Sequence, residues 1–403
     1  MISNMDDPFK HIRAEMEANQ TELEKLVENN NAEALLACMI QQLLSVVPDQ
    51  NIGDQLGAHP AMIEILAEAC IPRFGKNSTS PISPLVSNYC YSILDRLVHQ
   101  RMFDSISISN IPSNISMQSS IVRGSAYPEQ TSNKVKNIQG RFDNWFQKKY
   151  GISPSRTVDV VDTLVQRAEA LFSEQLQANK EEGEKSKERY RTLIKRDNRT
   201  SKEQAFVDLF SESEDDEGAA FLFGYVAITN IYAESELPAD LASLELSPKL
   251  KKSEIIAFKK LFCLNRESMG STEHIQRKTF YELTSGKVLF SEISNSFDVI
   301  WDKFEELAML DNTFYSSRYQ KAKAQWVETQ TFEYLCKIFP SSCVYRNLTY
   351  PDPTKKNGNT ELDLAIHWGP FLVVIEAKSN PVSYTHLRPH ETEADLVCRL
   401  LLE

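Results

Sequence analysis

The sequence lacks any run of about 18 apolar residues, the length that a membrane-spanning helix requires. Its first residues, MISNMDDPFKHIRAEM, contain no apolar segment of the kind found in secretory signal peptides. We therefore expect a cytoplasmic protein without a membrane partner. The 403 residues are 41% hydrophobic and 25% charged, which is typical of a soluble globular chain with two or three domains.

Several chemical signatures are also missing. The seven cysteines include no CxxC pair, so the sequence indicates neither a structural zinc site nor a disulfide framework. There is no glycine-rich phosphate loop, no GxSxG nucleophile elbow and no internal repeat. A net charge of -12 excludes a surface that is basic all over, so contact with a nucleic acid would need a local basic patch.

Apolar residues recur at helical spacing through most of the first 310 residues. The spacing predicts helices over five ranges: 32–47, 60–71, 85–103, 253–264 and 297–310. A long helix is expected from Thr157 to about Arg191, and its later part is highly charged. Such a charge run favours a solvated helix face over a nucleic-acid contact. Short strands are expected on either side of a Ser285-Gly286 turn.

The last third of the chain changes character. Residues 317–339 predict a helix that Pro340 stops, and residues 343–350 alternate like a strand. Two further strands are joined by a Gly-Pro turn, and the second, Phe371–Ile375, is a continuous apolar run that predicts a strand buried on both faces. We therefore expect a mainly α N-terminal region followed by a truncated α/β domain in which one helix precedes a three-stranded sheet.

Two acids and a lysine interrupt these core-like strands: Asp363, Glu376 and Lys378. A buried charge is costly unless it is paired or bound to a metal. Two carboxylates at the ends of adjacent strands can hold Mg²⁺, which polarises a scissile phosphate and lowers the pKa of a bound water. Lys378 follows Glu376 by two residues and so points to the same face, where it can orient the attacking water or neutralise developing charge. The pattern therefore fits phosphodiester hydrolysis.

The segments TELDL and FLVVIEAKS resemble the PD-(D/E)xK nuclease superfamily, with its restriction-endonuclease-like fold, and its nuclease-related (NERD-like) branch in particular. The resemblance covers residues 318–380, under a fifth of the chain. It implies a hydrolase that acts as an endonuclease on DNA, or less commonly on RNA, with Mg²⁺ or Mn²⁺ as cofactor. Asp363 and Glu376 would then be metal ligands and Lys378 the catalytic lysine, while the backbone carbonyl of Ala377 would complete the metal shell.

The resemblance also implies a catalytic glutamate on the helix before the first strand. Glu328 lies in phase with Phe332 and Leu335, part of the apolar stripe that should face the sheet, whereas Glu333 lies off this stripe. We expect Glu328 to supply this carboxylate, with Glu333 as the alternative. Gln325 is a weaker neighbour that could assist.

Basic residues near these positions could contact the substrate. Arg318, Lys321 and Lys323 lie on the helix that leads to the candidate glutamates, and Lys355 and Lys356 precede the motif strands. Both groups could meet phosphate near the metal, although ordinary solvated lysines are an equally good interpretation.

Residues 382–403, VSYTHLRPHETEADLVCRLLLE, resemble a translated sequencing adapter followed by a flow-cell primer. Asn380 would then be the last wholly genuine residue, and His386 and His390 would carry no evolved chemistry despite their metal-like spacing. In the family the core continues after the lysine with a helix and a strand, which this tail replaces. We therefore expect an exposed strand edge, poor folding at the C-terminus and a chain that is weakly active or inactive as written, while the intact gene product could still be a nuclease.

These patterns divide the chain into four segments: a helical domain over 1–135, a helical region with the long charged helix and an acidic loop over 136–310, a partial nuclease-like domain over 311–380, and an artefactual tail over 381–403. Two other interpretations stay open. In one, Asp363 and Lys378 form a cross-strand ion pair, Glu376 lies at a solvated strand end, and the domain binds nucleic acid or protein without chemistry. In the other, the long charged helix mediates assembly. The sequence does not determine the oligomeric state.

Overall fold

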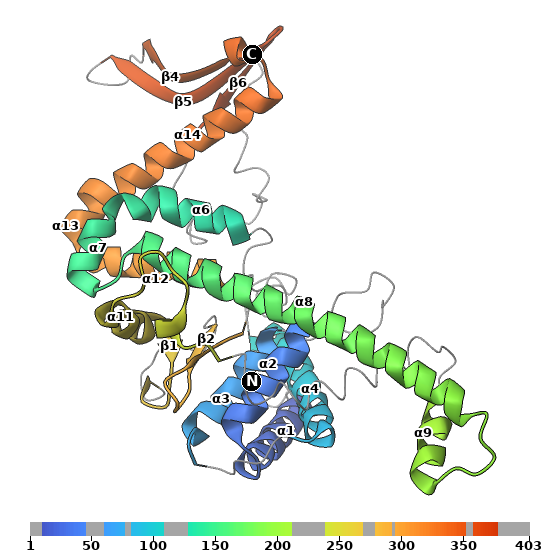
Figure 1. The fold of residues 1–403 in the computed structure, drawn as a ribbon. Coiled ribbons are helices and arrows are strands. Elements are labelled where there is room, and N and C mark those ends of the chain that lie inside the picture. The colour runs from blue at the N-terminus through green and yellow to red at the C-terminus, as the bar shows by residue number, and fades with distance from the viewer. Residues whose placement is uncertain are drawn as a thin grey trace, which may run out of the picture. The chain divides into compact units, whose positions relative to one another are not determined.

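The computed structural model describes residues 10–45, 60–76, 82–108, 128–211, 238–268, 279–291, 295–351 and 358–377. These residues are mostly helical, with two small three-stranded sheets (Figure 1). The prediction of a mainly α protein with a small sheet near its C-terminus is confirmed at this level. None of the helices in the described ranges is long and apolar enough to cross a membrane. Outside the described residues lie the acidic segment 212–217, Lys355, Lys356, Lys378 and the adapter-like tail.

The chain divides into two compact units, residues 1–132 with 143–303, and residues 133–142 with 304–403. The four segments derived from the sequence stay a prediction. The described residues also contain the helical elements η1 (Ile71–Arg73), α6 (Pro128–Ile138), η2 (Gln139–Phe142), α7 (Asp143–Tyr150), η3 (Leu241–Ser243), α11 (Lys252–Phe262), α12 (Ser296–Met309), α13 (Asn312–Phe314) and η6 (Ser341–Cys343).

The first unit contains a helical core made by α1 (Lys10–Glu28), α2 (Ala32–Ser45), α3 (Pro60–Cys70) and α4 (Pro84–Ile108). A small sheet packs against it, with strands β1 (Cys263–Leu264), β2 (Phe280–Glu282) and β3 (Val288–Phe290). Leu264, Tyr281 and Leu289 of these strands belong to the same buried cluster as the helices. The hairpin between β2 and β3 turns at Gly286, whose φ of 78° suits glycine, so the predicted turn is confirmed.

The predicted long helix is confirmed as α8 (Pro154–Leu193). Its start follows from local sequence, because the Ser153 hydroxyl accepts a hydrogen bond from the Arg156 amide and Pro154 suits the first helical turn. A short connection leads to α9 (Ser201–Ser211), which packs back against the end of α8. The two helices form a hairpin, which Figure 1 shows in green.

The second unit carries the candidate nuclease-like elements. A π-helical turn, η5 (Tyr315–Tyr319), leads into α14 (Gln320–Ile338), which ends just before Pro340 as predicted. The strands β4 (Val344–Pro351), β5 (Asn359–Trp368) and β6 (Phe371–Ile375) form an antiparallel sheet in that order. Helix α14 packs against β4 and β5 (Figure 1), with the Arg346 guanidinium 5.1 Å from the Phe332 ring.

The prediction that Phe371–Ile375 is buried on both faces is wrong. Strand β6 lies at the edge of its sheet, and within the described residues it pairs only with β5. Phe371 and Leu372 therefore keep 53% and 54% of their surface exposed. Glu376 is exposed and Asp363 half-buried, so neither carboxylate interrupts a fully buried strand. The buried part of this sheet is the centre of β5, residues 364–366.

Candidate metal centre

Strands β5 and β6 bring Asp363 and Glu376 to the same end of the sheet. Leu364 pairs with Ile375 in the β5–β6 ladder, and one further step in this register places Asp363 opposite Glu376. Directly opposite residues of antiparallel strands share a face. The Ala377 amide donates a hydrogen bond to Asp363 Oδ2 at 2.8 Å, so the Asp363 carboxylate also ties β5 to the segment after β6.

Helix α14 adds a third carboxylate. Glu328 is half-buried, and its pKa is raised by its burial and by the negative charges of Asp363 and Glu361. Carboxylates repel each other strongly enough to shift a pKa only when they lie close together. The negative charges of β5 therefore act on Glu328 in addition to its burial, and its catalytic role stays a prediction.

The alternative helix residue has a different environment. Glu333 is exposed, and one of its carboxylate oxygens accepts a hydrogen bond from the Gln330 side chain at 2.9 Å. Gln325 is also exposed, and its backbone carbonyl accepts a hydrogen bond from the Thr329 hydroxyl. The geometry therefore favours Glu328 over Glu333 as the helix residue that faces the strand carboxylates.

Glu361 is a member of this group that the sequence reasoning missed. It precedes Asp363 by two residues, and side chains two apart on a strand share a face. This spacing was available in the TELDL segment and could have indicated that two acids, Glu361 and Asp363, share one face of the strand. Its effect on the pKa of Glu328 now places it in the same electrostatic environment.

Strand β4 is distorted beside this group. Asn347 adopts a φ of 55°, the left-handed conformation that asparagine tolerates better than other non-glycine residues. In the β4–β5 register it lies across from Asp363, between the Arg346–Leu364 and Leu348–Leu362 pairs. The backbone irregularity therefore adjoins the candidate site rather than a remote part of the sheet.

Comparison with known proteins gives no match for this chain: no family model, no curated protein and no solved structure matches it. The resemblance to the PD-(D/E)xK superfamily thus stays a prediction, and the candidate centre has to be assessed by its own chemistry.

The available donors suit a hard cation. Within the described residues, no three His, Cys, Asp or Glu side chains lie close enough together to form a metal site on their own. The predicted donor set is smaller, with the carboxylates of Asp363 and Glu376 and the carbonyl of Ala377, and all of its donors are oxygen atoms, as Mg²⁺ and Mn²⁺ prefer. The repulsion that Asp363 and Glu361 exert on Glu328 is a cost that a bound cation would relieve.

The basic strip expected on the helix is only partly formed. The prediction that Lys323 contacts phosphate is wrong, because Lys323 is buried and its Nζ pairs with the Glu305 carboxylate at 2.5 Å. Arg318 is exposed, with its guanidinium 6.0 Å from the Phe314 ring, and Lys321 is exposed as well. A phosphate contact on this helix would therefore depend on Arg318 and Lys321.

The raised pKa of Glu328 predicts a specific pH dependence of stability. The folded protein binds the Glu328 proton more tightly than the unfolded chain, so the free energy of unfolding falls as pH rises from the usual glutamate value of 4.5 through the raised pKa. Glu328→Gln cannot ionise, so its stability relative to wild type should increase over this pH interval. Urea unfolding on both sides of the interval measures the difference.

Glu333→Gln is the matched control, since it makes the same change on the same helix at an exposed position. It should follow the wild-type pH profile. Equal pH dependence in Glu328→Gln and Glu333→Gln would show that Glu328 does not interact with the strand carboxylates in solution. Saturating Mg²⁺ should reduce the advantage of Glu328→Gln, because a cation offsets the repulsion.

Proposed function

We propose that the gene product without the adapter-like residues 382–403 is a metal-dependent endonuclease that hydrolyses phosphodiester bonds in DNA. The observation that carries the proposal is the β5–β6 register, which puts Asp363 opposite Glu376 and lets the Ala377 amide donate to Asp363 Oδ2 at 2.8 Å. The charges of Asp363 and Glu361 also act on Glu328 of α14, whose pKa is raised by burial and by these charges. Two carboxylates opposite each other on adjacent strands are oxygen donors that can hold a divalent cation beside a phosphate group. The choice of DNA as the substrate rests on the resemblance to the PD-(D/E)xK superfamily.

Each residue of the group has a role in this proposal. Asp363, Glu376 and the Ala377 carbonyl would hold Mg²⁺ or Mn²⁺, which would supply Lewis-acid polarisation of the phosphate and a bound water of lowered pKa. Glu328 would orient the attacking water and accept its proton, a task that a carboxylate with a raised pKa suits. Lys378 would neutralise charge that develops on the phosphate oxygens.

The proposal is tested by plasmid nicking with the uninterrupted gene product. Supercoiled DNA should be cut with Mg²⁺ and stay intact with EDTA. Glu328→Gln should lower the rate by about 10²–10⁴-fold, the range for loss of a general acid or base. Glu333→Gln should keep the wild-type rate. Cleavage that persists in EDTA, or equal rates for the two variants, would contradict the proposal.

One observation favours a second candidate, a binding module without chemistry that contacts nucleic acid or protein. Asp363 already has a structural partner, because it accepts the Ala377 amide hydrogen bond. If that is its whole function, the protein would bind DNA and fail to cut it with any divalent metal. Fluorescence anisotropy with labelled duplex, run beside the nicking assay, separates the two functions.

A further inference from the structure

The end of α8 and the turn after it form the most basic part of the described chain. Residues 185–199 contain seven basic and two acidic residues, a net charge of +5 in a protein whose total charge is -12. A local concentration of this kind is the electrostatic footprint expected of a surface that contacts a polyanion. The sequence alone favoured a solvated helix face, because the same helix carries several acids one or two turns earlier.

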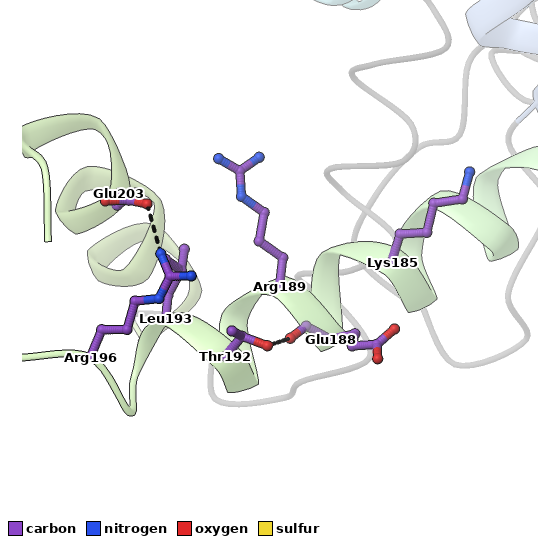
Figure 2. Close-up of a pocket in the computed structure, with 7 residues that line it drawn as sticks. All are labelled: Lys185, Glu188, Arg189, Thr192, Leu193, Arg196 and Glu203. Carbon is purple, nitrogen blue, oxygen red and sulfur yellow. Dashed lines mark hydrogen bonds and ion pairs between the residues drawn. The ribbon is translucent and has the colours of Figure 1, made fainter.

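The hairpin gathers part of this charge around one hollow. The hollow has a volume of about 380 Å³, and Lys185, Arg189 and Arg196 contribute to its lining. Figure 2 shows Lys185 and Arg189 extending from the same side of α8, with Arg196 beyond them at the turn. Glu188 and Glu203 also line the hollow, so its charge is mixed while its basic residues outnumber its acids.

The acid nearest the turn already has partners of its own. The Glu203 carboxylate accepts hydrogen bonds from the Thr200 amide and hydroxyl, at 2.8 and 2.9 Å, which caps α9. These bonds lower its pKa, and Arg196 lies 3.5 Å from it. Glu203 therefore stabilises the turn, and the nearby charges of Arg196 and Arg189 lower its pKa further.

Two arginines are held in place by the hairpin itself. The Arg199 guanidinium donates to the Leu193 and Ile194 carbonyls, at 2.8 and 3.0 Å, which closes the end of α8. The Arg189 guanidinium lies 4.8 Å from the Phe206 ring of α9, a cation–π contact that restricts its position. The basic side chains are thus displayed by a folded turn and lose less conformational freedom when they bind a ligand.

We propose that the α8–α9 hairpin, residues 185–203, binds the phosphate backbone of a nucleic acid. The identity of the partner rests on the proposed function, which requires a phosphodiester substrate. Arginine forms bidentate hydrogen bonds to phosphate, and such contacts hold a nucleic acid without reading its sequence. Lys323, one of the phosphate contacts expected beside the metal centre, is buried. The hairpin therefore exposes more basic side chains than the helix beside the candidate site.

The test is binding of a labelled 20-base-pair duplex to the full chain by fluorescence anisotropy, in EDTA and over a series of salt concentrations. The double variant Lys185→Gln/Arg189→Gln removes two phosphate contacts. It should reduce the slope of log affinity against log salt by about 2, and weaken binding by roughly tenfold at moderate salt. The variant Arg191→Gln/Lys195→Gln changes two exposed residues of the same hairpin and should weaken binding in the same way.

The matched control is Lys249→Gln/Lys252→Gln, which makes the same change in charge at exposed lysines outside the hairpin. It should bind like wild type. Equal losses of DNA affinity in the hairpin and control variants would overturn the inference. Hairpin variants with unchanged DNA affinity but an altered elution volume in size-exclusion chromatography would also overturn it, because that result would assign the surface to self-association. Hairpin-dependent binding, together with no Mg²⁺-dependent cleavage by the uninterrupted gene product, would leave the inference standing and refute only the endonuclease function.

Discussion

Replacing Asp363 by Asn is expected to lower the rate of Mg²⁺-dependent DNA cleavage by at least about 10²-fold. Loss of a group that only orients a metal ligand costs up to about 10²-fold, and Asp363 is proposed as a ligand itself. The substitution takes away the negative charge that a divalent cation requires. It keeps an oxygen that can accept the Ala377 amide hydrogen bond, which in wild type has a length of 2.8 Å. The Asp363→Asn variant therefore separates the contribution of this residue to folding from its contribution to metal binding.

The comparison with Asp363→Ala makes this separation measurable. The alanine variant loses both the charge and the hydrogen bond, and leaving a half-buried amide without its partner costs about 1–3 kcal/mol. Asp363→Asn should therefore unfold in urea close to wild type, while Asp363→Ala unfolds at lower urea, and both lose cleavage. If Asp363→Asn cleaves DNA at the wild-type rate, Asp363 is a structural residue and the metal centre is wrongly assigned.

Replacing Lys323 by Met is expected to lower the free energy of unfolding of the second unit by about 3–5 kcal/mol, the range for breaking a buried ion pair on one side. Lys323 and Glu305 keep only 8% and 12% of their side-chain surface exposed, and their charged atoms are 2.5 Å apart. The Tyr315 hydroxyl donates to the same Glu305 oxygen at 3.4 Å. Without Lys323 the Glu305 charge would be left largely buried with this one weak donor.

The double variant Glu305→Leu/Lys323→Met shows whether the stability lost in Lys323→Met comes from the unpaired, buried Glu305 charge or from lost packing. Removing both members of a buried pair is often close to neutral, so the double variant should recover most of the stability that Lys323→Met loses. Urea unfolding of the two single variants and the double variant gives the coupling free energy. Additive losses would mean that the two side chains do not interact in solution.

The order of elements around the candidate site followed from local sequence. The 317–339 pattern, Pro340 and the alternation of 343–350 predicted a helix, its end and a strand, and α14 and β4 lie there. Periodicity and proline act within a few residues, so one sequence suffices to read them. Glu328 was selected from helical phase, and the effect of the Asp363 charge on its pKa agrees with that selection, while its catalytic role stays a prediction.

The failures concern partners that are distant in the sequence. The apolar run Phe371–Ile375 has the composition of a central strand, yet composition does not say whether a second strand is present on its other side. Lys323 has the helical spacing of a surface lysine, and nothing near it in the sequence reveals that Glu305 of α12 lies against it.

Calorimetric titration of Mn²⁺ into the uninterrupted gene product tests the metal centre most directly. Wild type and Glu333→Gln should each show one binding site, while Asp363→Asn and Glu376→Gln should lose it, with all four proteins folded by circular dichroism. Identical isotherms for the four proteins, or no binding to wild type under conditions in which it cuts DNA, would contradict the assignment.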